Sequence, residues 1–145
     1  MTIFCDTNVL VAAFLESHAH HPPARPVLER IHGGKDKGFV AAHSLAEAFS
    51  VLTRLPGADH VEPLLAWQLI SDNILKTFTI VALNAREYAE VLRNAAEENV
   101  SGGRIYDLIL LAAAAKTKAD RILTFNIQHF RSLAPPTIRP RIVSP

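Results

Sequence analysis

Three acidic residues, Asp6, Glu47 and Asp107, follow or interrupt apolar segments that lie far apart in the sequence. A fourth such position, where another acid would be expected, holds Asn126. An unpaired carboxylate is expensive to bury, and carboxylates gathered in one place repel one another. If the fold brings these residues together they need a cation, so we predict that they jointly hold a divalent metal ion.

Each acid also has a purely structural explanation when it is considered alone. Asp6 can cap a helix, because an Asp there accepts backbone N–H bonds and complements the helix dipole. Glu47 lies at the border of a helical apolar stripe, where a solvated Glu is the commonest outcome. Asp107 can be a first-turn acid. It is, however, the only charge between Arg104 and Lys116, and a helix so apolar must be largely buried.

Short strands alternating with helices are expected to position these side chains. The expected strands are Thr2–Cys5, Gly38–Ala42, Thr77–Leu83, Arg121–Thr124 and, at an edge, Ile138–Val143. The expected helices cover residues 8–15, 24–32, 43 or 44 to 55, 62–75, 84–98 and 105–118. Residues 17–23 (SHAHHPP) are expected to form a loop, and Asn84 is expected to cap a helix.

This alternation indicates an α/β fold with a parallel sheet covered by helices on both faces. In such folds, ligands bind beyond the carboxyl ends of the strands. Asp6 lies at the end of the first strand and Asn126 lies two residues after the fourth, so both are placed for chemistry at that edge. Successive residues of a strand point to opposite faces of the sheet, so we do not expect Cys5 and Asp6 to form one site together.

The composition is that of a globular protein. The chain has 145 residues, 49% of them hydrophobic and 20% charged, so we expect one domain over residues 1–145. The longest apolar run, 108–115, is too short to span a membrane, and the first residues carry no basic flank typical of a signal peptide. A single cysteine excludes an internal disulfide, and we expect a cytoplasmic protein.

The charges are unevenly distributed. Residues 1–100 hold eight Lys or Arg against twelve Asp or Glu, whereas residues from 101 onward hold seven against two. A basic region beside an acidic site would suit a polyanionic substrate. The alternative is ordinary solvated surface.

Three segments together resemble the PIN-domain family. They are FCDTNVLVAAF, HSLAEAFSVLTRLP and GGRIYDLILLAAAAKTKADRILTFNIQHF, in the family's order and separation over nearly the whole chain. They are most similar to the VapC-type toxins of bacterial toxin–antitoxin pairs. The resemblance implies a three-layer α/β/α sandwich with a mainly parallel sheet. It also implies a metal-dependent endoribonuclease that hydrolyses RNA phosphodiester bonds.

The resemblance assigns Asp6, Glu47 and Asp107 as catalytic residues that hold Mg²⁺ or Mn²⁺. This agrees with the preference of Mg²⁺ for oxygen ligands, for retained waters and for completion by a substrate phosphate. Thr124 and Asn126 are similar to the Thr-x-Asp/Asn motif that supplies the fourth position. Because Asn126 brings no charge, we expect weak metal affinity before RNA binds.

Further residues are expected to contact the substrate. Thr7 and Asn8 match the small polar residues beside the first acid, and Arg104 is a candidate for contacting phosphate. His129 could assist, although a lone His in a basic loop more often faces solvent. The three histidines of the 17–23 loop lack a cysteine or second cluster, which favours a flexible loop over a zinc site.

The resemblance further implies RNA as substrate, a cognate antitoxin whose tail covers the site, and a homodimer. The helix that carries Leu64, Leu65, Trp67, Leu69 and Ile70 offers apolar surface for either interface, although Trp67 could equally be core. A second hypothesis is a PIN-like domain that binds RNA or a protein partner without cutting, since the fourth acid is missing. A third is a nuclease acting on DNA or flap structures.

Overall fold

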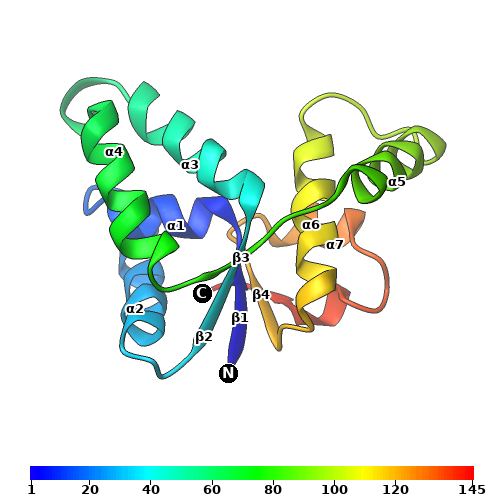
Figure 1. The fold of residues 1–145 in the computed structure, drawn as a ribbon, viewed down its shortest axis with the longest axis horizontal. Coiled ribbons are helices and arrows are strands. Elements are labelled where there is room, and N and C mark those ends of the chain that lie inside the picture. Colours follow the sequence, from blue (N-terminus) through cyan, green and yellow to red (C-terminus); the bar gives the residue numbers. More distant parts are fainter.

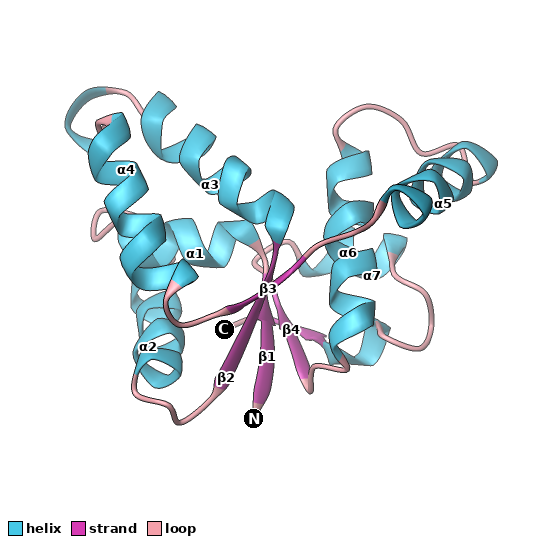
Figure 2. Ribbon diagram, viewed as in Figure 1, coloured by secondary structure: helices cyan, strands magenta, loops and turns pink.

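A five-stranded parallel sheet forms the centre of the molecule (Figure 2). The computed structural model describes residues 1–145. The strands are β1 (Thr2–Cys5), β2 (Lys37–Ala41), β3 (Thr79–Val81), β4 (Arg121–Leu123) and β5 (Ile142–Val143). Their order is β3-β2-β1-β4-β5, so the first strand of the chain is the central one. Its neighbour β4 comes more than a hundred residues later in the sequence.

Seven α-helices surround the sheet. They are α1 (Thr7–Phe14), α2 (His21–His32), α3 (Ala42–Arg54), α4 (Pro63–Ile70), α5 (Ala85–Glu97), α6 (Arg104–Thr117) and α7 (Ile127–Leu133). A π-helical turn (Ser71–Leu75) extends α4, and short 3-10 turns occur at Gly57–Asp59 and Arg139–Arg141. None of these helices combines the length and apolar character that a membrane span requires.

The helices form one layer on each face of the sheet (Figure 1). Helices α1 to α4 bury one apolar cluster, and α6 and α7 bury the other, while α5 packs on the outside of α6. The pleat of β1 divides its side chains between these clusters: Ile3 and Cys5 face the first, and Phe4 faces the second. The predicted three-layer α/β/α sandwich is therefore confirmed.

Most of the predicted elements are present, with shifted ends. The asparagine predicted to cap α5 does so in a capping box, in which Asn84 and Glu87 each accept from the other's backbone N–H. Trp67 is about half exposed, so its alternative placement in the core is wrong. Cys5 is fully buried in the first cluster, and burial, with a smaller contribution from the Asp6 charge, raises the pKa of its thiol.

Two predicted segments need correction, and one helix was missed. Helix α2 begins at His21, inside the predicted loop, because Pro22 and Pro23 occupy its first turn, where no amide donor is needed. The last strand is only Ile142–Val143, since Pro140 lies in a 3-10 turn. Helix α7 was not predicted at all, because its seven residues fall below the length of about eight from which a helical pattern is usually recognised.

Candidate active site

Asp6 and Thr124 meet at the carboxyl edge of the sheet because their strands are neighbours. In the pairing of β1 with β4, Cys5 lies opposite Leu123, so the residue that follows each strand reaches the same edge. The backbone N–H of Asp6 donates to the carbonyl of Leu123 at 2.9 Å. The Thr124 hydroxyl then donates to Asp6 Oδ2 at 2.7 Å. Asp6 occupies the N-cap position of α1, as its structural explanation expected, but its side chain makes no capping hydrogen bond to that helix.

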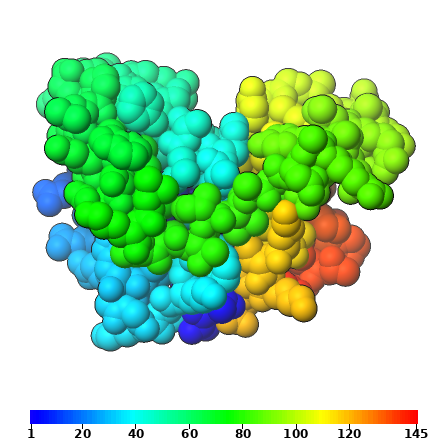
Figure 3. Space-filling model, viewed as in Figure 1, coloured from blue at the N-terminus to red at the C-terminus, as the bar shows by residue number.

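Glu47 and Asp107 reach the same place from opposite layers. Glu47 lies in the second turn of α3, which follows β2, and Asp107 lies in the first turn of α6. Together with Asp6 and Asn126 they line a pocket of about 200 Å³. Its other lining residues are Thr7, Asn8, Val11, His18 and Val51. In the space-filling view, the molecule is hollowed between α3 and α6 (Figure 3).

A polar network built on Thr124 fixes the floor of this pocket. Besides donating to Asp6, the fully buried hydroxyl accepts from Asn8 Nδ2 at 3.3 Å and from the Asn126 backbone N–H at 3.0 Å. The Asn8 side-chain oxygen accepts from the Phe125 backbone N–H at 3.3 Å. The loop after β4 is therefore tied to the start of α1. Asn126 itself is exposed, and its side chain faces the pocket without a protein partner of its own.

The acids perturb one another in the way expected of a metal centre. Burial raises the pKa of Asp6 to about 7; Glu47 and Asp107 add to this, and the Thr124 hydrogen bond opposes it. Burial also raises the pKa of Asp107, and Glu47 adds to that rise, while His129 and Arg104 act against it. A carboxyl group with so high a pKa is ionised only in part at neutral pH, so a cation bound here would have to displace a proton and would relieve the repulsion between the acids.

His129 lies on α7 and not in a solvent-facing loop, as its sequence context had favoured. Its Nδ1 is 3.0 Å from Asp107 Oδ2, and its side chain is 40% exposed. Arg104 is the first residue of α6 and is exposed near Asp107. His129 and Arg104 therefore both lie beside Asp107, where the Arg104 guanidinium is placed to contact a phosphate.

Glu47 is held by two further side chains. The Thr7 hydroxyl donates to Glu47 Oε2 at 3.1 Å, and His43 Nε2 lies 3.6 Å from the same oxygen. The sequence analysis did not single out His43, although its position four residues before Glu47 on a helix would have placed the two on one face. His18, from the predicted flexible loop, lines the pocket.

The pocket offers the oxygen donors that a hard cation takes, from Asp6, Glu47, Asp107 and Asn126. No three of the chain's His, Cys, Asp or Glu side chains are close enough to hold one ion between them. The donor set therefore fits a cation that keeps part of its water shell, as Mg²⁺ does, better than one held by protein atoms alone.

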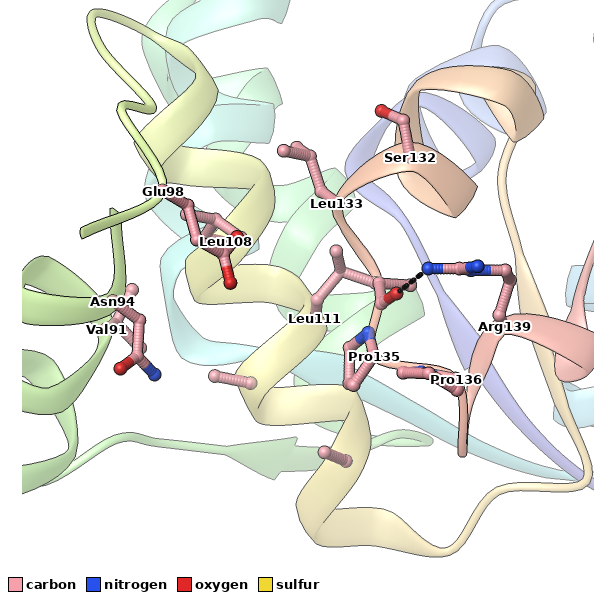
Figure 4. Close-up of a pocket in the computed structure, with 13 residues that line it drawn as sticks. Val91, Asn94, Glu98, Leu108, Leu111, Ser132, Leu133, Pro135, Pro136 and Arg139 are labelled. Carbon is pink, nitrogen blue, oxygen red and sulfur yellow. Dashed lines mark hydrogen bonds between the residues drawn. The ribbon is translucent and has the colours of Figure 1, made fainter. Parts of the chain in front are cut away.

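A second pocket, of about 410 Å³, lies away from the acids. It is formed by α5, α6, the end of α7 and the following turn, with apolar residues such as Leu108, Leu111 and Pro135 in its lining (Figure 4). Arg139 lies at its side and donates to the Ala134 carbonyl at 2.9 Å. It contains no pair of convergent acids, so we assign the chemistry to the acid pocket.

Replacing Thr124 by Val is expected to weaken both the fold and the site. The change removes the only hydroxyl that joins Asp6, Asn8 and Asn126. We expect a loss of about 1–3 kcal/mol in unfolding free energy, because buried polar groups lose a partner. Any metal-dependent activity should fall about 10- to 100-fold, as when a ligand loses the group that orients it. Urea unfolding and initial rates measure the two effects.

The matched control is Thr137→Val, because Thr137 is exposed and outside the site. Equal effects of the two substitutions would show that the Thr124 network does not support the pocket.

Comparisons with known proteins show the family of the chain. Residues 3–134 match the PIN domain family. The chain is 33% identical over 124 residues to Ribonuclease VapC40 of Mycobacterium tuberculosis, covering 85% of each sequence. The chain therefore belongs to the PIN domain family. Within that family, its sequence similarity is to the VapC type.

Two solved structures share the fold. The crystal structure of Mycobacterium tuberculosis VapC20, described as a sarcin–ricin loop cleaving toxin, superposes with a TM-score of 0.68 at 16% identity, covering 90% of this chain and 94% of that one. VapBC2 from Rickettsia felis, bound to a DNA fragment from its promoter, gives 0.62 at 19% identity, covering 90% and 92%. At these identities the similarity concerns the fold.

Proposed function

We propose that this protein is a metal-dependent endoribonuclease, the toxin of a toxin–antitoxin pair, that hydrolyses RNA phosphodiester bonds. One observation carries the proposal: acids from three distant segments, Asp6, Glu47 and Asp107, line one pocket in which the pKa of Asp6 is raised to about 7. Membership of the PIN domain family and similarity to a ribonuclease of the VapC type support it.

In this proposal Asp6, Glu47 and Asp107 would hold Mg²⁺ or Mn²⁺, and Asn126 would add an uncharged oxygen that supports the ion weakly. When bound, the ion supplies an activated water and neutralises charge on the leaving oxygen. The protein's own groups keep the carboxylates in place: Thr124 orients Asp6, and Thr7 orients Glu47.

The groups around the acids position the substrate. His129 favours the ionised form of Asp107, and Arg104 contacts a phosphate of the RNA. Thr7, Asn8 and Thr124 shape the floor on which that phosphate rests. The basic residues after position 100 continue the contact along the RNA backbone.

Metal binding by the free protein is expected to be weak, because three carboxylates and one amide replace four carboxylates. Isothermal calorimetry with Mg²⁺ should give a dissociation constant well above the micromolar range. Asn126→Asp should tighten it by about tenfold or more, since a charged donor is added at the exposed rim of the pocket. Submicromolar affinity of the unmodified protein would contradict this expectation.

We further propose that the protein acts in the cytoplasm as a homodimer and is inhibited by a cognate antitoxin. The exposed apolar side chains of α4 are available for the dimer interface and for the antitoxin interface. Leu64 is 69% exposed, Trp67 52% and Leu65 49%. The fold is shared with a chain of VapBC2 from Rickettsia felis.

The proposal is tested by incubating the purified protein with a mixed pool of tRNA and rRNA. The assay is run with Mg²⁺, with Mn²⁺ and with a chelator, beside the Asp6→Asn variant. Discrete fragments that require metal and are missing with the variant support the nuclease. Intact RNA under every condition, from folded protein free of antitoxin, overturns it.

A second candidate is a domain that binds RNA or a protein partner without cutting. The uncharged Asn126 and the absence of three converging ligands favour it. Asp107→Asn separates the two: loss of cleavage with RNA binding retained identifies an enzyme, and an unchanged activity identifies a binding module. Including DNA and flap substrates in the same assay tests the third hypothesis, a nuclease acting on those substrates.

A further inference from the structure

Two stacked pairs of rings stand beside the acid pocket. The His43 ring lies against the Tyr106 ring with centroids 5.0 Å apart and an angle of 6° between the planes. The His20 ring lies against the Phe125 ring at 4.2 Å and 12°. Both pairs join segments that are distant in the sequence, so the fold and not local geometry brings the rings together.

The first pair is adjacent to two of the acids. Tyr106 directly precedes Asp107 on α6, and His43 Nε2 lies 3.6 Å from Glu47 Oε2. Tyr106 is 50% exposed although His43 covers part of it. The core does not need a tyrosine in that place, and its open surface is available to a ligand.

The second pair lies on the other side of Asp6. Phe125 follows β4, directly before Asn126, whereas His43 lies at the start of α3, directly after β2. In the sheet, β2 and β4 are the two neighbours of β1, at whose end Asp6 stands. The two ring pairs therefore flank the acid along the carboxyl edge of the sheet. His20 is exposed, so this pair also has a surface open to solvent.

We propose that the two ring pairs are stacking platforms for unpaired RNA bases on either side of the scissile phosphate. This inference rests on the proposed nuclease function and names the side chains that hold the bases next to the cut. Stacking on an aromatic ring requires a base that has left its helix, so the RNA is single-stranded or looped where it is cut. Every base has an aromatic face, so the platforms accept any base. They therefore select unpaired RNA and do not select a base sequence.

Binding measurements on two labelled RNAs test the platforms. One RNA is single-stranded with mixed sequence, and the other has the same backbone without bases. Fluorescence anisotropy is measured with Mg²⁺ in the Asp6→Asn background, which keeps the RNA intact. Tyr106→Ala should weaken binding of the RNA that has bases roughly 5- to 100-fold. Binding of the RNA without bases should not change. His20→Ala should act in the same direction.

Two variants serve as controls. Tyr106→Phe keeps the ring and should bind within about twofold of the parent. Tyr88→Ala removes a tyrosine that is 38% exposed on α5, outside the acid pocket, and should have no effect on either RNA.

The outcomes separate this inference from the function on which it rests. Equal weakening with both RNAs would make Tyr106 a structural residue and overturn the platform. Unchanged binding by Tyr106→Ala, with RNA still cut by the unmodified protein, would overturn the platform alone. Failure of the unmodified protein to bind or cut any RNA would overturn the nuclease function as well.

Discussion

Asp6→Asn is expected to abolish RNA cleavage while leaving a folded and more stable protein. Asp6 is the most buried acid of the pocket, and its Oδ2 accepts a hydrogen bond from the Thr124 hydroxyl at 2.7 Å. Asn keeps the shape of the side chain but removes the charge that binds a cation in the proposed site. We expect the cleavage rate to fall at least about 100-fold, the upper end of what is lost when a metal ligand merely loses its orienting partner. Gel analysis of metal-dependent fragments measures this loss.

The gain in stability has a definite pH dependence. The pKa of Asp6 is raised from 3.8 to about 7, so between these values the folded protein holds a proton that the unfolded chain has released. Stability of the metal-free protein therefore falls as pH rises from about 4 to about 7, by as much as roughly 4 kcal/mol. The raised pKa of Asp107 acts in the same direction.

Urea midpoints measured in chelator at about pH 5 and about pH 8 give the comparison. The parent should be less stable at the higher pH, and Asp6→Asn should flatten that difference because one of the buried acids is gone. Added Mg²⁺ should stabilise the parent more than the variant. A variant that is less stable than the parent at pH 8 in chelator would mean that the carboxylate is not under electrostatic strain.

Phe4→Ala is expected to have the largest effect on stability. Phe4 is fully buried in the central strand and packs into the cluster beneath α6 and α7. The cavity left by its ring should cost about 3–5 kcal/mol, a large part of the stability of a domain of this size. Phe4 is two residues before Asp6, so the pocket should also lose order. Urea unfolding followed by circular dichroism measures the change in midpoint.

Phe4→Leu is the graded control, since Leu fills most of the same space. It should cost no more than about 1.5 kcal/mol. Equal losses from Ala and Leu would point to a ring interaction in place of a cavity. A loss below about 1 kcal/mol from Ala would mean that the strand relaxes around the missing ring.

The class of fold was predictable because its signals are local. Each strand is a short apolar run, and each helix carries its own periodicity or breakers, as with Asn84 at the start of α5. The ends of β3 and β5 were not predictable, because pairing in the sheet decides how many residues of an apolar run become strand. The start of α2 was predicted too late because of its prolines. Proline breaks a helix in its interior but is suitable in the first turn, where Pro22 and Pro23 lie.

The acids were predictable as candidates because a carboxylate in an apolar segment is conspicuous. Thr7, Thr124 and His129 were predicted as site residues, but their contacts with the acids were not predictable, because such contacts depend on the folded arrangement. His129 meets Asp107 only because α7 packs beside α6, and Thr7 meets Glu47 across forty residues of sequence. The stacking of His43 on Tyr106 likewise joins two helices whose relative placement no local pattern specifies.

The strand order has a consequence for how the protein is made. Asp6 emerges early from the ribosome, but the hydroxyl that orients it belongs to Thr124, and β1 remains without one neighbour until β4 has been synthesised. Chains grow from the N-terminus, and contacts between distant segments form last. A nascent or stalled chain therefore lacks a finished catalytic centre. If the protein cuts RNA as proposed, this order of synthesis delays its toxicity until nearly the whole chain has been translated.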